Sequence, residues 1–368
     1  MRKKVPDGGL TYAAAGVDVE AGARAVELMD EARSRTIASS LADVIKRRNG
    51  FAATVRIPGT DLVLLASTDG VGTKLQVATR TRRNGTVGKD IVHHGINDLL
   101  AMGPADPIGF LDYVASPKLK PEQMAEIVIG LCEALETHGW PLIGGETAEM
   151  PGTYKAGEYD LVGTIIGIVN EGDLLNPDNV RLGDHIIGIA SDGLGTNGYT
   201  LARTAFFDVM GHNTRFILRI GKDGVPITVA DALLLPHRCY YQSVAPIMRR
   251  GLVKSAAHIT GGGIPGNLRR ALPNYTKAVL DTASWHNERR PWIFDMIRNA
   301  VNQPLDDYFT TFNDGIGFAL VVDKDNARLV LKLLREAGEH ALDIGRVRRY
   351  YAERSGVVIR TPEGELNY

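Results

Sequence analysis

The sequence predicts a mixed α/β protein of two halves, and three observations lead to this fold class. The chain has 368 residues, which is enough for roughly two domains. Apolar runs typical of buried strands alternate with amphipathic helical stretches along its length. The pattern Asp-Gly-aliphatic-Gly-Thr occurs at 69–73 and again at 192–196, each time between an expected strand and an expected helix. We therefore expect domains over 1–172 and 173–368, each placing one such loop at a shared cleft.

The first half is expected to alternate strands and helices before a turn-rich boundary. Its periodicity predicts a strand over 61–68, a helix over 87–103, a strand over 108–115, a helix over 120–139, a short strand entering a glycine turn after Trp140, and a strand over 159–170. Pro121 and Gly139 occupy positions that these residues favour at the start and end of a helix. The polar segment 171–184 marks the boundary.

The second half is expected to restart the same alternation. Strands are predicted over 185–191, 255–260, 277–281 and 315–323, with a final pair over 346–361. Helices are predicted over 199–210, 230–251, 267–272, 291–300 and 326–338.

Composition excludes several classes of partner. Lysine and arginine total 42 against 43 acidic residues, a net charge of −1, so nucleic acid and anionic membrane are poor candidates. The chain has neither an apolar run long enough to span a bilayer nor a signal-peptide pattern at its start, which predicts a cytoplasmic protein. Cys132 and Cys239 show no metal-binding spacing and are expected to be core residues in a reducing compartment.

The loop STDGVGTKL at 67–75 has the composition of a phosphate-binding turn. Gly70 and Gly72 allow backbone N–H groups to face an anion, and Lys74 adds a positive charge. Asp69 would repel phosphate unless a divalent cation lay between them, and Mg²⁺ prefers one or two carboxylates together with phosphate oxygens. The alternative is an ordinary Asp-Gly turn with a solvated lysine.

Two further polar groups suit the same chemistry. Asn97 and Asp98 fall within an otherwise apolar helix, where they are either a hydrogen-bonded core pair or contacts to a metal–nucleotide complex. Glu146 and Glu149 follow two glycines and would share one face of a helical turn, as metal ligands or as acids that complement the helix dipole. The adjacent pair at 93–94 points to different sides of a helix, so we interpret both histidines as structural.

The segment HITGGGIPGNLRRALP at 258–273 matches the dinucleotide pattern G-x-G-x-x-G at Gly261, Gly263 and Gly266. The helix expected after it ends before Pro273, which is short for a Rossmann crossover, and the fingerprint belongs to the first strand of its domain. We therefore expect no NAD binding there, whereas phosphate binding by the glycine run stays open.

Together these motifs resemble the aminoimidazole ribonucleotide synthetase, or phosphoribosylformylglycinamidine cyclo-ligase, family. The resemblance is carried, in the family's order, by YAAAGVDVEAG, STDGVGTKL, GINDLLAMGPADPIGFLDY, LIGGETAEMPGTY, DGLGTNGYTLAR, ADALLLPH, AHITGGGIPGNLRRALP and FNDGIGFALVV. It implies a homodimer with a barrel-like core to which the first domain adds strands, and ATP bound near the dimer interface. It also implies a reaction in which an amide oxygen of formylglycinamidine ribonucleotide takes the γ-phosphoryl group and a nitrogen then closes the imidazole ring.

The resemblance assigns candidate roles to residues of this sequence. The catalytic candidates are Lys74, Asp69 and Asn197. The ATP-binding candidates are Gly70, Gly72, Thr73, Lys74, Asn97, Asp98, Glu146 and Thr147. The substrate candidates are Asn197, Thr260, Gly261, Gly262 and Gly263, and the Mg²⁺ candidates are Asp69, Asp98, Glu146 and Asp112.

Two departures from the family pattern keep other functions open. Gly195 occupies a position where the family usually has histidine, and Asp314 one that is commonly apolar or small. The alternatives are another ATP-dependent enzyme of the superfamily and a non-catalytic ATP-binding paralogue. Selenophosphate synthetase is disfavoured because no cysteine precedes the first loop.

Overall fold

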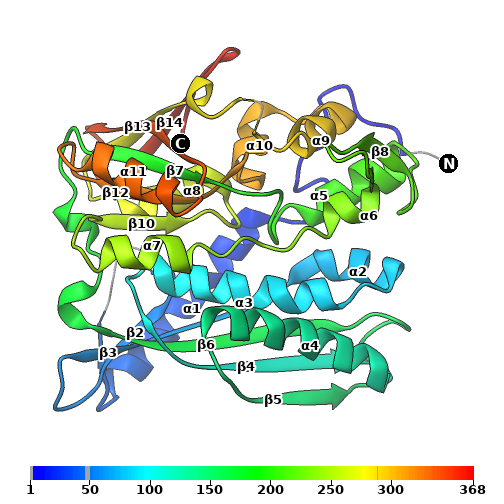
Figure 1. Cartoon of the computed structure of the whole chain (residues 1–368), viewed down its shortest axis with the longest axis horizontal. Helices are drawn as coiled ribbons and strands as arrows, with labels where there is room; N and C mark the ends of the chain where they lie inside the picture. The colour runs from blue at the N-terminus through cyan, green and yellow to red at the C-terminus, as the bar shows by residue number, and fades with distance from the viewer. Residues whose placement is uncertain (1–2, 46–49, 288) are drawn as a thin grey trace.

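A six-stranded sheet forms the first lobe of the molecule (Figure 1). The computed structural model describes residues 3–45, 50–287 and 289–368. In sheet order the strands are β1 (Asp43–Val44), β2 (Ala53–Arg56), β3 (Leu62–Gly70), β6 (Asp160–Asn170), β4 (Asp106–Ser116) and β5 (Leu142–Glu149). The accompanying helices are α1 (Val19–Ala38), α2 (Leu75–Thr81), α3 (Gly85–Leu100) and α4 (Pro121–His138).

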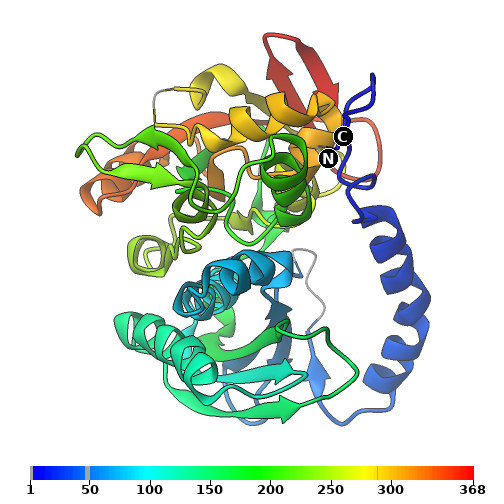
Figure 2. The ribbon, with the colours of Figure 1, turned by 90° about the vertical axis from the view of Figure 1, so that its right-hand side faces the viewer.

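One face of this sheet is covered by α3 and α4, and α3 lies between the sheet and the second lobe (Figures 1 and 2). Along β6, Leu161, Ile165 and Val169 are buried toward these helices, while the alternate residues at 162, 164, 166 and 168 are half-buried on the opposite face. A Cβ on Gly95 of α3 would lie 3.0 Å from the Ile165 side chain, so glycine allows this close approach of helix and strand. The helices expected over 87–103 and 120–139 are confirmed, and Gly139 ends α4 in the left-handed conformation.

The second lobe contains a seven-stranded sheet and most of the remaining helices. In sheet order its strands are β10 (Ser255–His258), β12 (Ile316–Val322), β7 (His185–Ala190), β13 (Ala341–Arg349), β11 (Thr276–Asp281), β14 (Gly356–Thr361) and β15 (Gly364–Asn367), with β8 (Ile217–Ile220) and β9 (Pro226–Thr228) forming a separate hairpin. Its helices are α5 (Tyr199–Arg203), α6 (Val229–Leu233), α7 (Tyr241–Met248), α8 (Gly263–Leu268), α9 (Ile293–Val301), α10 (Leu305–Thr311) and α11 (Ala327–Glu336). The mixed α/β class expected from the sequence is confirmed.

The start of the described chain packs on the second lobe, although the sequence assigned it to the first domain. The Leu10 N–H donates to Val301 O at 2.9 Å, and the Tyr12 N–H donates to the Asp307 carboxylate at 3.0 Å. Figure 2 shows α1 running from this region along the outside of the molecule to the first sheet. The division expected at 172/173 falls between β6 and β7 and stays a prediction.

The helix predicted over 230–251 is two helices, α6 and α7, separated by an irregular segment at 234–240. Pro236 lies in this segment and has no N–H for a helical hydrogen bond. The backbone of the segment bonds the first lobe instead: Leu235 O accepts from Lys74 Nζ at 2.6 Å, and the His237 N–H donates to Asp90 Oδ1 at 2.6 Å. These contacts between the lobes replace the helical hydrogen bonds.

A buried ion pair stands at the centre of the junction between the lobes. Lys74 Nζ lies 2.8 Å from Asp90 Oδ2, and both side chains are fully buried. Lys74 also donates to Gly195 O of the second loop at 3.2 Å. Burial lowers the pKa of Lys74 and raises that of Asp90, and the attraction between the two opposes both shifts. The pair therefore attaches the first loop to two segments of the second lobe.

Removing one partner of this pair should destabilise the protein. We expect Lys74→Met to lower the free energy of unfolding by about 3–5 kcal/mol, because an unpaired carboxylate would stay buried at Asp90. The measurement is urea unfolding followed by circular dichroism. The double variant Lys74→Met/Asp90→Leu is the control and should recover part of the loss; equal stability of Lys74→Met and the wild type would contradict this account.

Candidate active site between the two lobes

Five polar side chains meet where the first sheet, α3 and β10 come together, and we call them the imidazole–carboxylate cluster: Asp69, His94, Asp98, His237 and His258. Asp69 is the penultimate residue of β3, His94 and Asp98 lie one helical turn apart on α3, and His258 ends β10. All are buried except Asp69, whose side chain is 46% exposed. The cluster thus reaches solvent at Asp69.

Each carboxylate of the cluster contacts an imidazole. His94 Nε2 lies 2.8 Å from Asp69 Oδ2 and 3.7 Å from Asp98 Oδ2. His258 Nδ1 lies 2.8 Å from Asp98 Oδ1. Ser67 Oγ donates to Asp98 Oδ2 at 3.1 Å. The two lobes therefore share one polar network at this point.

The second ring nitrogen of each of these imidazoles also has a partner. His94 Nδ1 lies 2.9 Å from Thr196 Oγ1, a residue of the second Asp-Gly loop. His258 Nε2 lies 2.9 Å from His237 Nε2. His94 and His258 are consequently fixed in orientation from both sides.

The surroundings shift the pKa values of the three imidazoles in different directions. Burial would lower the pKa of His94, but the carboxylates of Asp98 and Asp69 outweigh it and raise that pKa to about 9. Burial lowers the pKa of His258 despite its Asp98 contact, and that of His237 more strongly. Burial would raise the pKa of Asp69, but His94 lowers it. At neutral pH the cluster contains a protonated His94 and neutral His237 and His258.

Of the four expected Mg²⁺ ligands, the described structure brings only Asp69 and Asp98 together. Asp69 and Asp112 both pair with Gly163 of β6, so they share a face but are two strands, or about 10 Å, apart. Glu146 pairs with Tyr113, one residue further along, so its side chain lies on the opposite face. Carboxylate oxygens are ligands that Mg²⁺ prefers, so Asp69 and Asp98 fit the ion, whereas a common site with Asp112 and Glu146 is wrong for a single chain.

Glu146 and Thr147 lie on β5, the edge strand furthest from β3 on that side of the sheet, and both are exposed. The expectation of a helical turn around Glu146 and Glu149 is wrong, because this segment pairs in parallel with β4 and side chains three apart on a strand face opposite ways. Glu149 accepts from the Leu119 N–H at 2.8 Å. One chain therefore does not place Glu146 and Thr147 at the cluster.

Two other predicted ATP contacts have structural partners instead. Lys74 was expected to face phosphate, but its ammonium is fully buried against Asp90 and two carbonyl groups. The Asn97 amide donates to Arg238 O at 2.7 Å and accepts from the Tyr240 N–H at 3.0 Å. Of the two interpretations of Asn97, the structure favours the hydrogen-bonded core residue.

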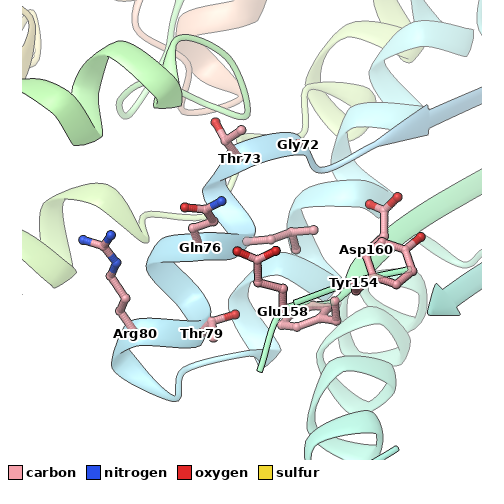
Figure 3. Close-up of a pocket in the computed structure, with 10 residues that line it drawn as sticks. Gly72, Thr73, Gln76, Thr79, Arg80, Tyr154, Glu158 and Asp160 are labelled. Carbon is pink, nitrogen blue, oxygen red and sulfur yellow. The ribbon is translucent and has the colours of Figure 1, made fainter. Parts of the chain in front are cut away.

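A cavity of about 340 Å³ lies beside the first loop (Figure 3). Its walls come from the loop, from α2 and from the segment that enters β6; the labelled lining residues are Gly72, Thr73, Gln76, Thr79, Arg80, Tyr154, Glu158 and Asp160. This volume lies within the usual range for small-molecule sites. Of the predicted ATP-binding residues, Gly72 and Thr73 line it, and Gly70 lies two residues before Gly72, at the end of β3.

The predicted substrate residues of the second lobe do come together. β10 leads into the glycine loop at 260–263, and a Cβ on Gly261 would lie 3.4 Å from Asn197 Nδ2. A Cβ on Gly263, whose φ is +60°, would lie 1.9 Å from Phe309 O, so packing requires glycine there. The Asn267 side chain donates to Gly261 O at 3.1 Å and Thr260 O at 3.3 Å, which fixes the loop. Because β10 is an antiparallel edge strand, the dinucleotide pattern lacks its Rossmann context.

Gly195 has a structural explanation. Its φ is +68°, and a Cβ there would lie 2.9 Å from His237 Nδ1. A side chain at position 195 would therefore strain the backbone and require a shift of His237, whose imidazole lies beside this position.

Asp314, the second departure, is a fully buried carboxylate with a full set of donors. Trp285 Nε1 donates at 2.9 Å, Arg290 Nε at 2.7 Å and the Tyr308 hydroxyl at 2.5 Å, and His286 Nε2 lies 2.6 Å away. Burial opposes ionisation, but these partners lower its pKa. Its role is structural.

The three histidines of the cluster are site residues that the sequence by itself does not single out. Adjacent residues diverge on a helix, which favours a structural role for the pair at 93–94, but the i,i+4 spacing of His94 and Asp98 places these two on one face. His258 and His237 had no local signal, since their partners are distant in sequence. Within the described residues, no helix is long and apolar enough to span a bilayer.

Comparison with known proteins agrees with this architecture. Residues 50–169 match the family "AIR synthase related protein, N-terminal domain" and residues 181–353 match its C-terminal counterpart. Among solved structures, the hydrogenase maturation protein HypE in complex with ATP aligns with a TM-score of 0.60 at 20% identity, covering 86% of each chain.

Curated relatives match more closely. The phosphoribosylformylglycinamidine cyclo-ligase of Myxococcus xanthus is 41% identical over 353 residues, covering 95% of this chain and 99% of the relative. That of Geotalea uraniireducens is 40% identical over 341 residues, covering 92% and 95%. Identity at this level over nearly the whole length shows that the chain belongs to the phosphoribosylformylglycinamidine cyclo-ligase family.

Proposed function

We propose that this chain catalyses the ATP-dependent closure of formylglycinamidine ribonucleotide to 5-aminoimidazole ribonucleotide, with release of ADP and phosphate, in purine biosynthesis. The observation that carries the proposal is that His94 joins the Asp69 and Asp98 carboxylates to Thr196, the neighbour of Asn197. His258 likewise joins Asp98 to the end of β10, from which the glycine loop 260–263 begins. Family membership supports it, because the matched relatives are named for this reaction. It is a ligase reaction on a small molecule, and we propose that it takes place in the cytoplasm.

Phosphoryl transfer to an amide oxygen requires positioning and charge neutralisation rather than a protein nucleophile. The substrate amide oxygen attacks the γ-phosphorus of ATP, and ADP leaves. A nitrogen of the same substrate molecule then attacks the carbon of the phosphorylated amide and loses a proton, which closes the imidazole ring. Phosphate leaves with the original amide oxygen. When bound, Mg²⁺ supplies neutralisation of the phosphate charge, and Asp69 and Asp98 are the residues that would hold it.

The chain's own residues would orient the two substrates. The cavity beside Gly72 and Thr73 is assigned to the nucleotide, with its phosphates directed toward Asp69 at the end of β3. Asn197 and the loop 260–263 are assigned to the amide and ribose phosphate of the ribonucleotide. Lys74 fixes the first loop against the second lobe, so we assign it a positioning role.

We also propose that two copies associate through the uncovered face and edge of the first sheet. The side chains of Ile108 on β4 and Ile143 on β5 are 42% and 53% exposed, and α3 and α4 cover only the other face. An association of this kind would cover that apolar area, and it would carry Glu146 and Thr147 to the site of the partner copy.

The proposed reaction is tested with the purified protein, ATP, Mg²⁺ and formylglycinamidine ribonucleotide. We expect ADP release that depends on the ribonucleotide, together with a diazotisable aminoimidazole product in equal amount. The control omits the ribonucleotide. ATP binding without either product would rule out the cyclo-ligase activity and favour the non-catalytic paralogue.

The metal assignment is tested by a matched pair of carboxylates on one face of the first sheet. We expect Asp69→Asn to lower kcat by about 10²–10³ at saturating ATP, because one preorganised group of the phosphoryl-transfer site is lost. Asp112→Asn, two strands away, should retain most of the activity. Similar losses in both variants would contradict the separation of these carboxylates.

Dimerisation is tested by placing a charge on the uncovered face. We expect the wild type to sediment as a dimer, and Ile143→Lys to sediment as a monomer with reduced activity. Ile129→Lys on α4 changes a residue of similar exposure, 58%, on the covered side and should leave the dimer intact. A monomeric wild type would refute the association.

A further inference from the structure

The imidazole–carboxylate cluster contains a set of metal-binding atoms that the proposed reaction does not require. We propose that His94, Asp98 and His258, with Asp69 at the solvent-exposed side, bind a divalent transition-metal ion of the Zn²⁺ and Co²⁺ class. The proposal concerns which divalent ion Asp69 and Asp98 hold: with the two imidazoles as further ligands, a transition metal takes the place assigned above to Mg²⁺.

The arrangement of the atoms supports such a site. One nitrogen or oxygen from each of His94, Asp98 and His258 lies within 4.8 Å of the other two. His258 Nδ1 lies 2.8 Å from Asp98 Oδ1, and His94 Nε2 lies 3.7 Å from Asp98 Oδ2. For comparison, two ligand atoms that are each about 2.1 Å from a tetrahedral ion are roughly 3.4 Å apart. Small side-chain adjustments, together with release of the proton that His94 carries in the metal-free cluster, would therefore bring the ligands into a first coordination sphere.

The donor types indicate the class of ion. Two imidazoles with one or two carboxylates are typical ligands of zinc and neighbouring transition metals, whereas Mg²⁺ takes oxygen ligands and retains several waters. His94 and His258 would be unnecessary for Mg²⁺, yet both direct a ring nitrogen at Asp98.

Each imidazole is oriented in the way metal-bound histidines usually are. A histidine ligand normally uses its second ring nitrogen to bond an outer partner, which fixes the ring and the tautomer. His94 Nδ1 has Thr196 Oγ1 at 2.9 Å, and His258 Nε2 has His237 Nε2 at 2.9 Å. Thr196 and His237 both belong to the second lobe. These outer contacts are a second observation, separate from the distances among the ligand atoms.

The proposed ligands are buried, but one side of the site is open to solvent. His94, Asp98 and His258 are 3%, 6% and 0% exposed, which limits competition from water. The half-exposed Asp69 leaves one side of the ion accessible to a ligand from solvent. Because α3 and β10 belong to different lobes, the bound ion would also join them.

The inference deepens the proposed function, since the same two carboxylates are assigned there to the ion that assists phosphoryl transfer. Its test uses neither nucleotide nor ribonucleotide, so its failure and the failure of the cyclo-ligase activity are distinguishable. A protein that binds the ion without turning over, or that turns over with Mg²⁺ alone, separates the two.

The experiment titrates the full-length, metal-free protein with Zn²⁺ by calorimetry and with Co²⁺ by visible absorption. We expect one ion per chain, d–d bands that report nitrogen and oxygen ligands, and no displacement by a hundredfold excess of Mg²⁺. His94→Gln and His258→Asn keep an amide N–H where each ring donated, and each should weaken Zn²⁺ binding at least about a hundredfold. Thr196→Val, which removes only an outer partner, should weaken it about 10–100-fold.

His212→Gln, which changes a histidine outside the imidazole–carboxylate cluster, is the matched control and should bind Zn²⁺ as the wild type does. Circular dichroism of each metal-free variant checks the fold. If His94→Gln or His258→Asn fails to fold, X-ray absorption of the Co²⁺-loaded wild type decides, with two imidazole ligands expected. Oxygen-only coordination, or a wild-type affinity for Zn²⁺ equal to that of His94→Gln and of His258→Asn, would show a hydrogen-bonded network that binds no transition metal and would overturn the proposal.

Discussion

The Lys74–Asp90 ion pair is the interaction on which the arrangement of the site depends. Both charges are removed from water, so they are tolerable only while they face each other and the peptide groups of Gly195, Leu235 and His237. Those peptide groups all belong to the second lobe. The pair therefore requires the two lobes to meet in one orientation, and this orientation is what brings α3 against β10.

The two related Asp-Gly loops contribute to the junction in different ways. In the first, Asp69 faces His94 and Lys74 enters the interior. In the second, Asp192 pairs with Arg238 near the surface, while Thr196 bonds the far side of His94. The first loop thus contributes charged side chains to the junction, whereas the second contributes backbone and hydroxyl groups. This difference fits the assignment of the first loop to metal and nucleotide.

The position of β5 explains why one chain leaves the expected ATP site incomplete. Three strand spacings separate β3 from β5, so no side-chain rotation can bring Glu146 to Asp69. The face of the sheet that β5 extends is apolar and half-exposed. A second copy on this face is the arrangement in which the residues assigned by the family resemblance would belong to one site.

The sequence by itself determined the elements with strong local signals: α4 with its proline start and glycine end, α3, β6 and the paired loops. It also determined the family, because the motifs occur in order along nearly the whole chain. Tertiary structure alone decided what each polar residue contacts. Lys74 looks like a phosphate ligand until Asp90 is placed beside it, and the glycine-rich segment at Glu146 becomes a strand because β4 offers it hydrogen bonds. His258 meets Asp98 across 160 residues of chain, a separation that no local pattern encodes.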